Sequence, residues 1–279
     1  MRARPARELI PIEDASDPRI AEFRDIRERD LVGRDGGFIA EGTVVLRMLI
    51  AAHAAGKGFM AEKILLLESR VAGLAGLLDE VAPDVPVYVA SAGILDAIAG
   101  FHLHRGVLAL GRRGPALNVE ALLAQAAAPA LVVVACGISN HDNIGSIFRN
   151  AAAFGASAVL MDERCCDPLY RKALRVSVGS VLSVPYARDT SALDLLSKVD
   201  HAGFSIWGLS PRGEADLRDI PTARGIALVT GTEGEGLPAE VLGRFRSARI
   251  PQREGLDSLN AATATGIALY ELARRQGLI

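Results

Sequence analysis

The feature that most constrains this chain is a glycine-rich run that directly follows an apolar run. Residues 225–230, Gly-Ile-Ala-Leu-Val-Thr, have the pattern of a buried strand, and residues 231–238 then read Gly-Thr-Glu-Gly-Glu-Gly-Leu-Pro. Three glycines within six positions let the backbone turn tightly and approach a ligand without a Cβ atom in the way. A connector without a ligand is the alternative, because glycine marks turns more often than sites.

A second loop lies before a long apolar helix that we expect over residues 260–276. It contains Arg249-Ile-Pro251 and then Asp257-Ser-Leu-Asn260. Ser258 and Asn260 stand where a side chain that caps the helix is expected. Two loops of this kind, each following a short strand, can together form a nucleoside pocket built largely from backbone groups.

Charge and cysteine content narrow the class of protein. A chain of 279 residues is expected to form about two domains. The formal net charge of −2 gives no overall attraction to nucleic acid, so any RNA contact must come from local patches. Cys136, Cys165 and Cys166 have no C-x-x-C spacing, which favours reduced thiols in a cytoplasmic protein and no metal site. No apolar run approaches the roughly 18 residues of a membrane span, so no membrane partner is expected.

The alternation of strand and helix patterns predicts two α/β domains. We expect an N-terminal extension over 1–17, a small α/β domain over 18–111, a linker over 112–129 and a second domain over 130–279. For the first domain we expect helices at 18–31, 43–55, 69–80 and 91–99 and strands at 36–42, 63–67, 85–89 and 106–110. For the second we expect strands at 131–135, 157–161, 181–185, 205–209, 225–230 and 248–250 and helices at 143–155, 167–175, 192–202, 240–245 and 260–276. The second pattern predicts a doubly wound parallel sheet.

Cations on the predicted helices are the candidate RNA contacts. Asn143 is expected to cap its helix, and Arg149 lies six residues further on, so the two do not share a face. Arg149 has apolar neighbours and no acid three or four positions away. A surface salt bridge is the alternative for Arg149, and phosphate is a suitable partner. Three cations on the next predicted helix complete the group: Arg171, Lys172 and Arg175.

Three motifs together resemble those of the SpoU/TrmH family, the RNA ribose 2′-O-methyltransferases of the SPOUT superfamily. The motifs are Asn143-x-Gly-x-x-x-Arg149, Gly231-x-Glu233-Gly-x-Gly236, and Ile250-Pro followed by Ser258-Leu-Asn260. They occur in the family's order and spacing within residues 130–276, and their combination is specific although each alone would be weak. Gln252 and the pair Ala261-Ala262 depart from the family pattern, but they lie outside the residues to which we assign chemistry.

The resemblance implies a C-terminal SPOUT domain with a deep trefoil knot and S-adenosyl-L-methionine as the cofactor. It implies that residues 18–111 form a substrate-binding domain similar to small RNA-binding ribosomal proteins. By motif position, five residues would hold the cofactor: Thr230, Gly231, Gly236, Ile250 and Leu259. The substrate would be a ribose 2′-hydroxyl in tRNA or ribosomal RNA.

The same resemblance assigns the chemistry to five side chains: Asn143, Arg149, Glu233, Ser258 and Asn260. A ribose hydroxyl is a poor nucleophile until its proton is removed or its developing charge is stabilised. The family's arrangement places Arg149 beside the hydroxyl as the proposed base, yet a guanidinium is effectively always protonated. Stabilising the developing alkoxide is therefore physically easier for Arg149. We expect Glu233 to organise its loop by accepting backbone N–H groups.

Two other functions stay open at this point. A SPOUT methyltransferase could act on an RNA base, and a non-catalytic RNA-binding protein could retain the same fold. The five intact side chains argue against the second alternative. A substrate that lacks a single 2′-hydroxyl separates the first alternative from ribose methylation.

The closing helix predicts the assembly. Residues 261–272 are apolar on nearly every side, and helices that are apolar all round are buried. One domain covers one broad face of such a helix, so we expect a second subunit to cover the rest. The resemblance likewise implies a homodimer, and we expect a site to which both chains contribute.

Overall fold

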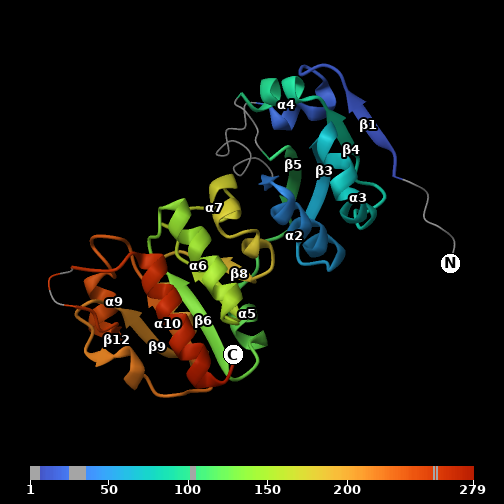
Figure 1. Cartoon of the computed structure of the whole chain (residues 1–279). Helices are drawn as coiled ribbons and strands as arrows, with labels where there is room; N and C mark the ends of the chain where they lie inside the picture. Colours follow the sequence, from blue (N-terminus) through green and yellow to red (C-terminus); the bar gives the residue numbers. More distant parts are fainter. Residues whose placement is uncertain (1–6, 25–35, 101–104, 254, 256) are drawn as a thin grey trace. The chain divides into compact units, whose positions relative to one another are not determined.

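Residues 169–183 belong to the second half of the sequence but pack with the N-terminal part of the chain. The computed structural model describes residues 7–24, 36–100, 105–253, 255 and 257–279. Unit 1 comprises residues 1–115 with 169–183, and unit 2 comprises residues 116–168 with 184–279 (Figure 1). The chain therefore passes between the units three times, near residues 115, 168 and 183.

Unit 1 contains a five-stranded mixed sheet in the order β1-β4-β3-β5-β2. Its strands are β1 (Leu9–Ile12), β2 (Gly37–Glu41), β3 (Phe59–Leu67), β4 (Val87–Ala90) and β5 (Val107–Arg113). Strands β1, β4 and β3 are parallel, whereas β5 is antiparallel to both β3 and β2. The helices are η1 (Pro18–Phe23), α2 (Thr43–Ala54), η2 (Glu68–Arg70), α3 (Val71–Asp79), α4 (Ala92–Ala99), α7 (Arg171–Val176) and η3 (Ser180–Leu182).

The first residues of unit 1 differ from the expected extension and helix. Strand β1 lies at the sheet edge within the segment 1–17, where no strand was predicted, and Pro11 is tolerated there because an edge position does not need every N–H group. Asp17 caps the next helix by accepting the Arg19 N–H. That helix is the 3₁₀ helix η1, and residues 25–31 of the predicted helix lie outside the described residues.

A buried acid ties α7 to β2 within unit 1. Glu41, the last residue of β2, is 6% exposed, and Arg171 Nη1 donates to Glu41 Oε2 at 2.9 Å. Arg175 Nη1 lies 3.9 Å from the same carboxylate oxygen. The predicted strand 181–185 is wrong: Val178 (φ 50°) and Gly179 (φ 80°) turn the chain into η3, and the strand begins only at Tyr186.

Removing Arg171 is expected to destabilise unit 1. Arg171→Ala leaves the Glu41 carboxylate buried beside the more distant Arg175, and breaking such a pair costs roughly 3 kcal/mol. The free energy of unfolding in urea measures the loss. The double variant Arg171→Gln/Glu41→Gln is the control, since it removes both charges. It should lose less free energy of unfolding than the sum of the losses in Arg171→Gln and Glu41→Gln. Additive losses would contradict a coupled pair.

Unit 2 contains an all-parallel seven-stranded sheet in the order β10-β12-β9-β11-β6-β7-β8. The strands are β6 (Ala130–Ala135), β7 (Ala158–Met161), β8 (Tyr186–Arg188), β9 (Ser205–Leu209), β10 (Ala215–Asp216), β11 (Gly225–Thr230) and β12 (Arg246–Arg249). The helices are α5 (Val119–Gln125), α6 (His141–Ala153), α8 (Ala192–His201), η4 (Leu217–Asp219), α9 (Ala239–Arg244) and α10 (Ala261–Gln276). The parallel α/β architecture expected for this part of the chain is confirmed.

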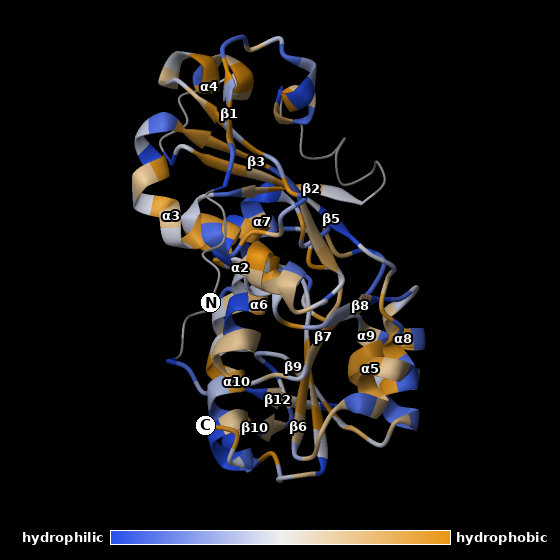
Figure 2. Ribbon diagram, turned by 90° about the vertical axis from the view of Figure 1, so that its right-hand side faces the viewer, coloured by the Kyte–Doolittle hydropathy of each residue, from blue (hydrophilic) through white to orange (hydrophobic). Residues whose placement is uncertain are grey.

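The helices of unit 2 cover both faces of the sheet. Helices α5, α8 and α9 pack on one face over a shared apolar core, whereas α6 and α10 lie side by side on the other (Figure 2). Strands β6 and β11 at the centre are buried along their whole length, as expected for a sheet covered on both faces. The short edge strand β10 was not predicted, because two residues give no periodic pattern.

Two local predictions for the helices need correction. Asn140, not Asn143, caps α6 by accepting the Asp142 N–H, and Asn143 lies inside the first turn. Helix α10 is not buried on all sides within this chain. It buries one face that includes Leu269 and Leu272, while Ile267 is 41% and Tyr270 50% exposed.

Candidate active site

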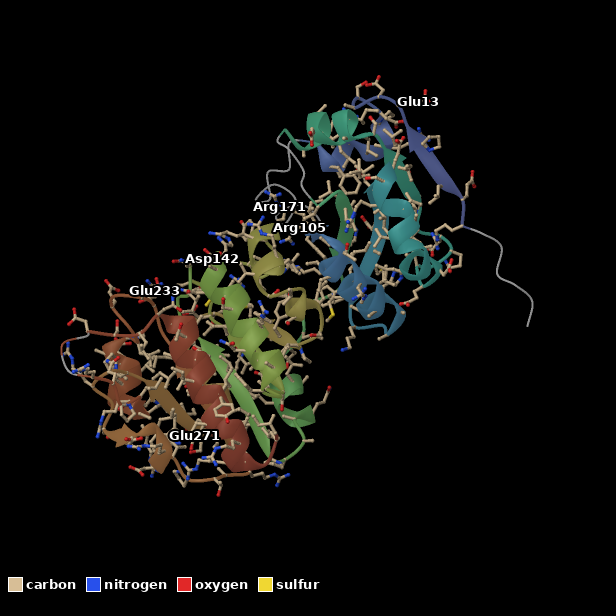
Figure 3. The ribbon with its side chains drawn as sticks, in the orientation of Figure 1. Glu13, Arg105, Asp142, Arg171, Glu233 and Glu271 are labelled. Carbon is tan, nitrogen blue, oxygen red and sulfur yellow. The ribbon has the colours of Figure 1, made fainter. Side chains whose placement is uncertain are left out.

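Side chains from all three motifs meet at the carboxyl ends of the central strands of unit 2. Asn143 comes from the first turn of α6, Glu233 from the loop after β11, and Asn260 from the start of α10. Each lies there because parallel strands bring the loops that follow them to the same edge of the sheet. Figure 3 shows Glu233 at this end of unit 2, beside Asp142 of α6.

The three side chains form one closed hydrogen-bond network. Asn143 Nδ2 donates to Glu233 Oε1 at 2.6 Å, and Asn260 Nδ2 donates to Asn143 Oδ1 at 2.9 Å. Asn260 Nδ2 also donates to Glu233 Oε1. The prediction that Glu233 accepts backbone N–H groups is therefore wrong in its partners: side-chain amides from two helices bind the carboxylate instead.

The network fixes the orientation of both amides. An ionised carboxylate only accepts hydrogen bonds, so each amide must present its NH₂ group to Glu233. Asn260 Oδ1 is left to accept the backbone N–H groups of Ala262 and Thr263, at 3.0 and 3.1 Å. Asn260 thereby caps α10, as predicted, and joins the network with the other end of the same amide. Asn143 is only 5% exposed, so its polar atoms depend on these partners.

The other two predicted catalytic residues stand apart from this network. Arg149 is exposed on α6, about 240° around the helix axis from Asn143. Within the part of the chain that the structure describes, its side chain makes no hydrogen bond or ion pair. Ser258 is exposed two residues before Asn260 and likewise has no hydrogen bond among the described residues. Neither side chain is therefore held in place by a hydrogen bond or ion pair to the described residues.

The predicted RNA-binding cations fall into different units. Arg149 belongs to unit 2, whereas the group on α7 (Arg171, Lys172 and Arg175) belongs to unit 1. Of these, Arg171 forms an ion pair with Glu41, and Arg175 lies near the same carboxylate.

The five predicted cofactor residues lie in or directly beside the glycine loop and the second loop. Thr230 is buried at the end of β11, with its Oγ1 3.1 Å from Thr265 Oγ1 of α10. Gly231 and Gly236 open and close the glycine loop, where the Thr232 N–H donates to the Gly236 carbonyl. Ile250 and Leu259 are half-buried at the two ends of the second loop. The Asn260–Glu233 contact joins the second loop to the first.

Gly231 leaves no room for a side chain. A Cβ atom there would lie 2.4 Å from the backbone of Gly236 and 2.6 Å from the Leu237 nitrogen. Gly231→Ala should therefore push the loop open and weaken S-adenosyl-L-methionine binding by at least about 10-fold, the equivalent of roughly 1.4 kcal/mol. Calorimetric titration measures the affinity. Gly243→Ala in α9 is the control, because no atom lies within 4 Å of its Cβ position; equal affinities in the two variants would contradict the assignment.

A pocket of about 240 Å³ adjoins the glycine loop, apart from the Asn143–Glu233–Asn260 network. Cys136 and Gly137 after β6, Asp162 and Arg164 after β7, and residues 232 and 235–239 line it. Of the predicted cofactor residues, this lining includes Gly236. Sequence reasoning missed Asp162 and Arg164, although their position directly after a predicted parallel strand was a usable signal.

Burial keeps the thiol beside this pocket protonated. It raises the pKa of Cys136 to about 12, and the neighbouring Asp162 carboxylate adds a smaller upward effect. Burial likewise raises the pKa of the Cys165 thiol, again with Asp162 contributing. Both side chains therefore act as small apolar groups near neutral pH rather than as nucleophiles.

A second, more open hollow of about 520 Å³ lies between α6 and α10. Phe154, Ile267 and Tyr270 give it apolar walls, with Phe154 and Tyr270 in edge contact at 5.7 Å between ring centroids. Asn150 crosses it by donating from Nδ2 to the Ala262 carbonyl at 3.0 Å. This hollow is therefore a groove between two helices with exposed apolar walls.

Two features are absent from the residues that the structure describes. No cluster of three or more His, Cys, Asp or Glu side chains is placed to hold a metal ion there. No helix in the described ranges is long and apolar enough to cross a bilayer.

Residues 130–270 match the model of the SpoU rRNA Methylase family. The chain is 40% identical over 272 residues to an uncharacterized tRNA/rRNA methyltransferase of Mycobacterium bovis. The matched region covers 94% of this chain and 90% of that protein. An uncharacterized tRNA/rRNA methyltransferase of Mycolicibacterium vanbaalenii is 34% identical over 65% of this chain and 59% of its own length.

Solved structures are similar across nearly the whole chain. An AdoMet-bound rRNA methyltransferase from Sinorhizobium meliloti has a TM-score of 0.79 and 25% identity, over 96% of this chain and 98% of that one. A structure of an RNA 2′-O ribose methyltransferase has a TM-score of 0.77 and 26% identity, over 98% of this chain and 100% of that one. The similarity thus includes the strands of both sheets.

Proposed function

Because this chain belongs to the SpoU rRNA methylase family, we propose that it is an RNA methyltransferase that acts on a ribose 2′-hydroxyl. S-adenosyl-L-methionine is the cofactor, as it is in AdoMet-bound structures of the same fold. When bound, the cofactor supplies an electrophilic methyl group: the ribose O2′–C bond forms, the S–C bond breaks with its electron pair going to sulfur, and the hydroxyl proton passes to water.

The observation that supports this function most directly is the Asn143–Glu233–Asn260 network. It brings Asn143 and Asn260, which lie 117 residues apart in sequence, onto the Glu233 carboxylate. A ribose is a polar, uncharged group, and it is best held by amides and carboxylates whose orientation is already fixed. The network provides such groups beside the glycine loop.

The residues of the two loops fit a nucleoside cofactor. The close approach of Gly231 to Gly236 keeps the loop narrow, so its backbone groups stay accessible instead of being covered by side chains. Ile250 and Leu259 are half-buried and offer apolar contact to an adenine ring. We propose that Thr230, Gly231, Gly236, Ile250 and Leu259 hold the adenosine.

Arg149 suits the role of electrostatic stabiliser. Its exposed guanidinium has no partner among the described residues, so it is available to a phosphate or to the developing alkoxide. Ser258 and Asn260 would orient the ribose, and Glu233 would hold both amides.

The remaining expectations from the resemblance are proposals of the same kind. We propose that unit 2 carries the trefoil knot, and that residues 18–111 contribute an RNA-binding domain that selects tRNA or ribosomal RNA. We also propose a homodimer, supported by the exposed Ile267 and Tyr270 beside the groove between α6 and α10. Apolar walls of this kind are typical of surfaces that a second subunit covers.

The decisive experiment is methyl transfer to paired RNA substrates. Unmodified tRNA and ribosomal RNA are screened with methyl-labelled cofactor, and the modified nucleotide is mapped. A substrate with a single 2′-deoxy nucleotide at that position should accept no methyl group. Undiminished transfer to the deoxy substrate would instead assign the activity to an RNA base, and absence of cofactor binding by calorimetry would favour a non-catalytic RNA-binding protein.

A further inference from the structure

The pocket beside Arg164 lies at the topological switch point of the sheet in unit 2. From β6 the chain continues to β7 and β8 on one side, whereas β11 and β9 lie on the other. The helices that follow β6 and β11 consequently pack on opposite faces of the sheet (Figure 2). In open parallel sheets, the crevice at such a point is where ligands bind.

This pocket shares the glycine loop with the proposed cofactor site but not the second loop, which contains Ile250 and Leu259. Its lining comes from the ends of β6, β7 and β11, and among the described residues it includes none from 250–260. Glu233 faces Asn143 and Asn260, while Glu235 and Gly236 of the same loop line the pocket. One loop thus separates the proposed catalytic network from the pocket.

The loop that carries Arg164 is braced on several sides. Asp162 is 3% exposed, and its carboxylate accepts the Gly137 N–H at 2.9 Å and the Cys165 N–H at 3.1 Å. The Cys166 N–H donates to the Ile138 carbonyl. Arg188 Nη1 adds a hydrogen bond to the Cys165 carbonyl at 2.8 Å. The backbone around Arg164 is therefore positioned before any ligand arrives.

The polar groups left over in the pocket match a nucleotide. Arg164 is exposed and makes no ion pair or hydrogen bond within the described part of the chain. The same holds for the Glu235 carboxylate. A guanidinium suits a phosphate, and a carboxylate accepts hydrogen bonds from the amino group of a nucleobase.

We propose that this pocket binds a nucleotide of the RNA strand next to the target ribose, with its phosphate on Arg164 and a base amino group on Glu235. The proposal rests on the proposed function for its choice of RNA. It adds a specificity subsite to the reaction: the flanking nucleotide is held on one side of the glycine loop while the target ribose lies on the other.

The test measures RNA binding and cofactor binding separately. Fluorescence anisotropy with labelled, unmodified tRNA and ribosomal RNA transcripts, between 50 and 200 mM salt, gives affinity and salt dependence. Arg164→Ala should weaken RNA binding about 3- to 10-fold and lower the salt slope by about 1, because one phosphate contact is lost. Glu235→Gln should keep the salt slope. Calorimetric affinity for S-adenosyl-L-methionine should be unchanged in both variants.

Arg224→Ala is the matched control. Arg224 is an exposed arginine that directly precedes β11, at the opposite edge of the same sheet, so its removal should leave RNA binding unchanged. A salt slope in Arg164→Ala equal to that of the wild type would overturn the proposal. Loss of cofactor affinity would also overturn it, by assigning the pocket to the amino-acid end of the cofactor. Binding is measured without turnover, so a wild-type protein that binds RNA but methylates none refutes the proposed function alone.

Discussion

Asn260→Asp is expected to lower kcat for RNA methylation by about 10²- to 10³-fold, the usual cost of losing one oriented donor at a reacting group. The aspartate keeps the oxygen that accepts the Ala262 and Thr263 N–H groups, so α10 stays capped. It loses the Nδ2 donor to Asn143 and Glu233 and places a second carboxylate against the first. Incorporation of labelled methyl groups into RNA measures the loss.

The controls for this variant separate capping from chemistry. Asn260→Asp should lower the thermal unfolding temperature less than Asn260→Ala, because asparagine and aspartate are equivalent caps and alanine is not. The double variant Asn260→Asp/Glu233→Gln should recover part of the activity, since the glutamine amide can donate to the new carboxylate and the like charges are gone. Full activity in Asn260→Asp would show that the network does not contribute to catalysis.

Much of the fold of unit 2 follows from local sequence. Strands β6, β7, β9 and β11 lie within one residue of their predicted positions, because each is built around a short apolar run. Segment 181–185 was misassigned although its composition suits a strand. The conformation just before it is set by packing within unit 1: a Cβ on Gly179 would lie 2.8 Å from Met48 of α2, a contact that no local pattern contains.

The candidate site was predictable in its members but not in its connections. Motif order singled out Asn143, Glu233 and Asn260, since each follows or precedes a recognisable strand or helix. Which atoms pair depends on how α6 and α10 pack, and this packing brings together residues more than 100 positions apart. Arg164 was missed although it follows a predicted parallel strand, because that position alone does not show that the fold places a pocket beside it.

The geometry of α6 leads to the strongest test of assembly. Asn143 is fixed inside its own chain's network, whereas Arg149 projects elsewhere from the same helix and has no partner among the described residues. Arg149 is proposed to act at the network although it faces away from it. A two-fold dimer allows this, because each chain can supply its Arg149 to the other chain's site. The exposed Ile267 and Tyr270 of α10 offer a surface for that contact.

Mixing two inactive variants, Arg149→Ala and Asn260→Ala, should therefore restore activity. In a mixed dimer, one shared site contains both substitutions and the other contains neither, so half of the sites work. Random pairing of equal amounts makes half of the dimers mixed, which gives roughly a quarter of wild-type activity, and purified mixed dimers give roughly a half. Co-expression with two affinity tags isolates the mixed dimers, and each variant alone is the baseline. Confirmed mixed dimers without recovery would confine each site to one chain, and a monomer by light scattering would refute the dimer itself.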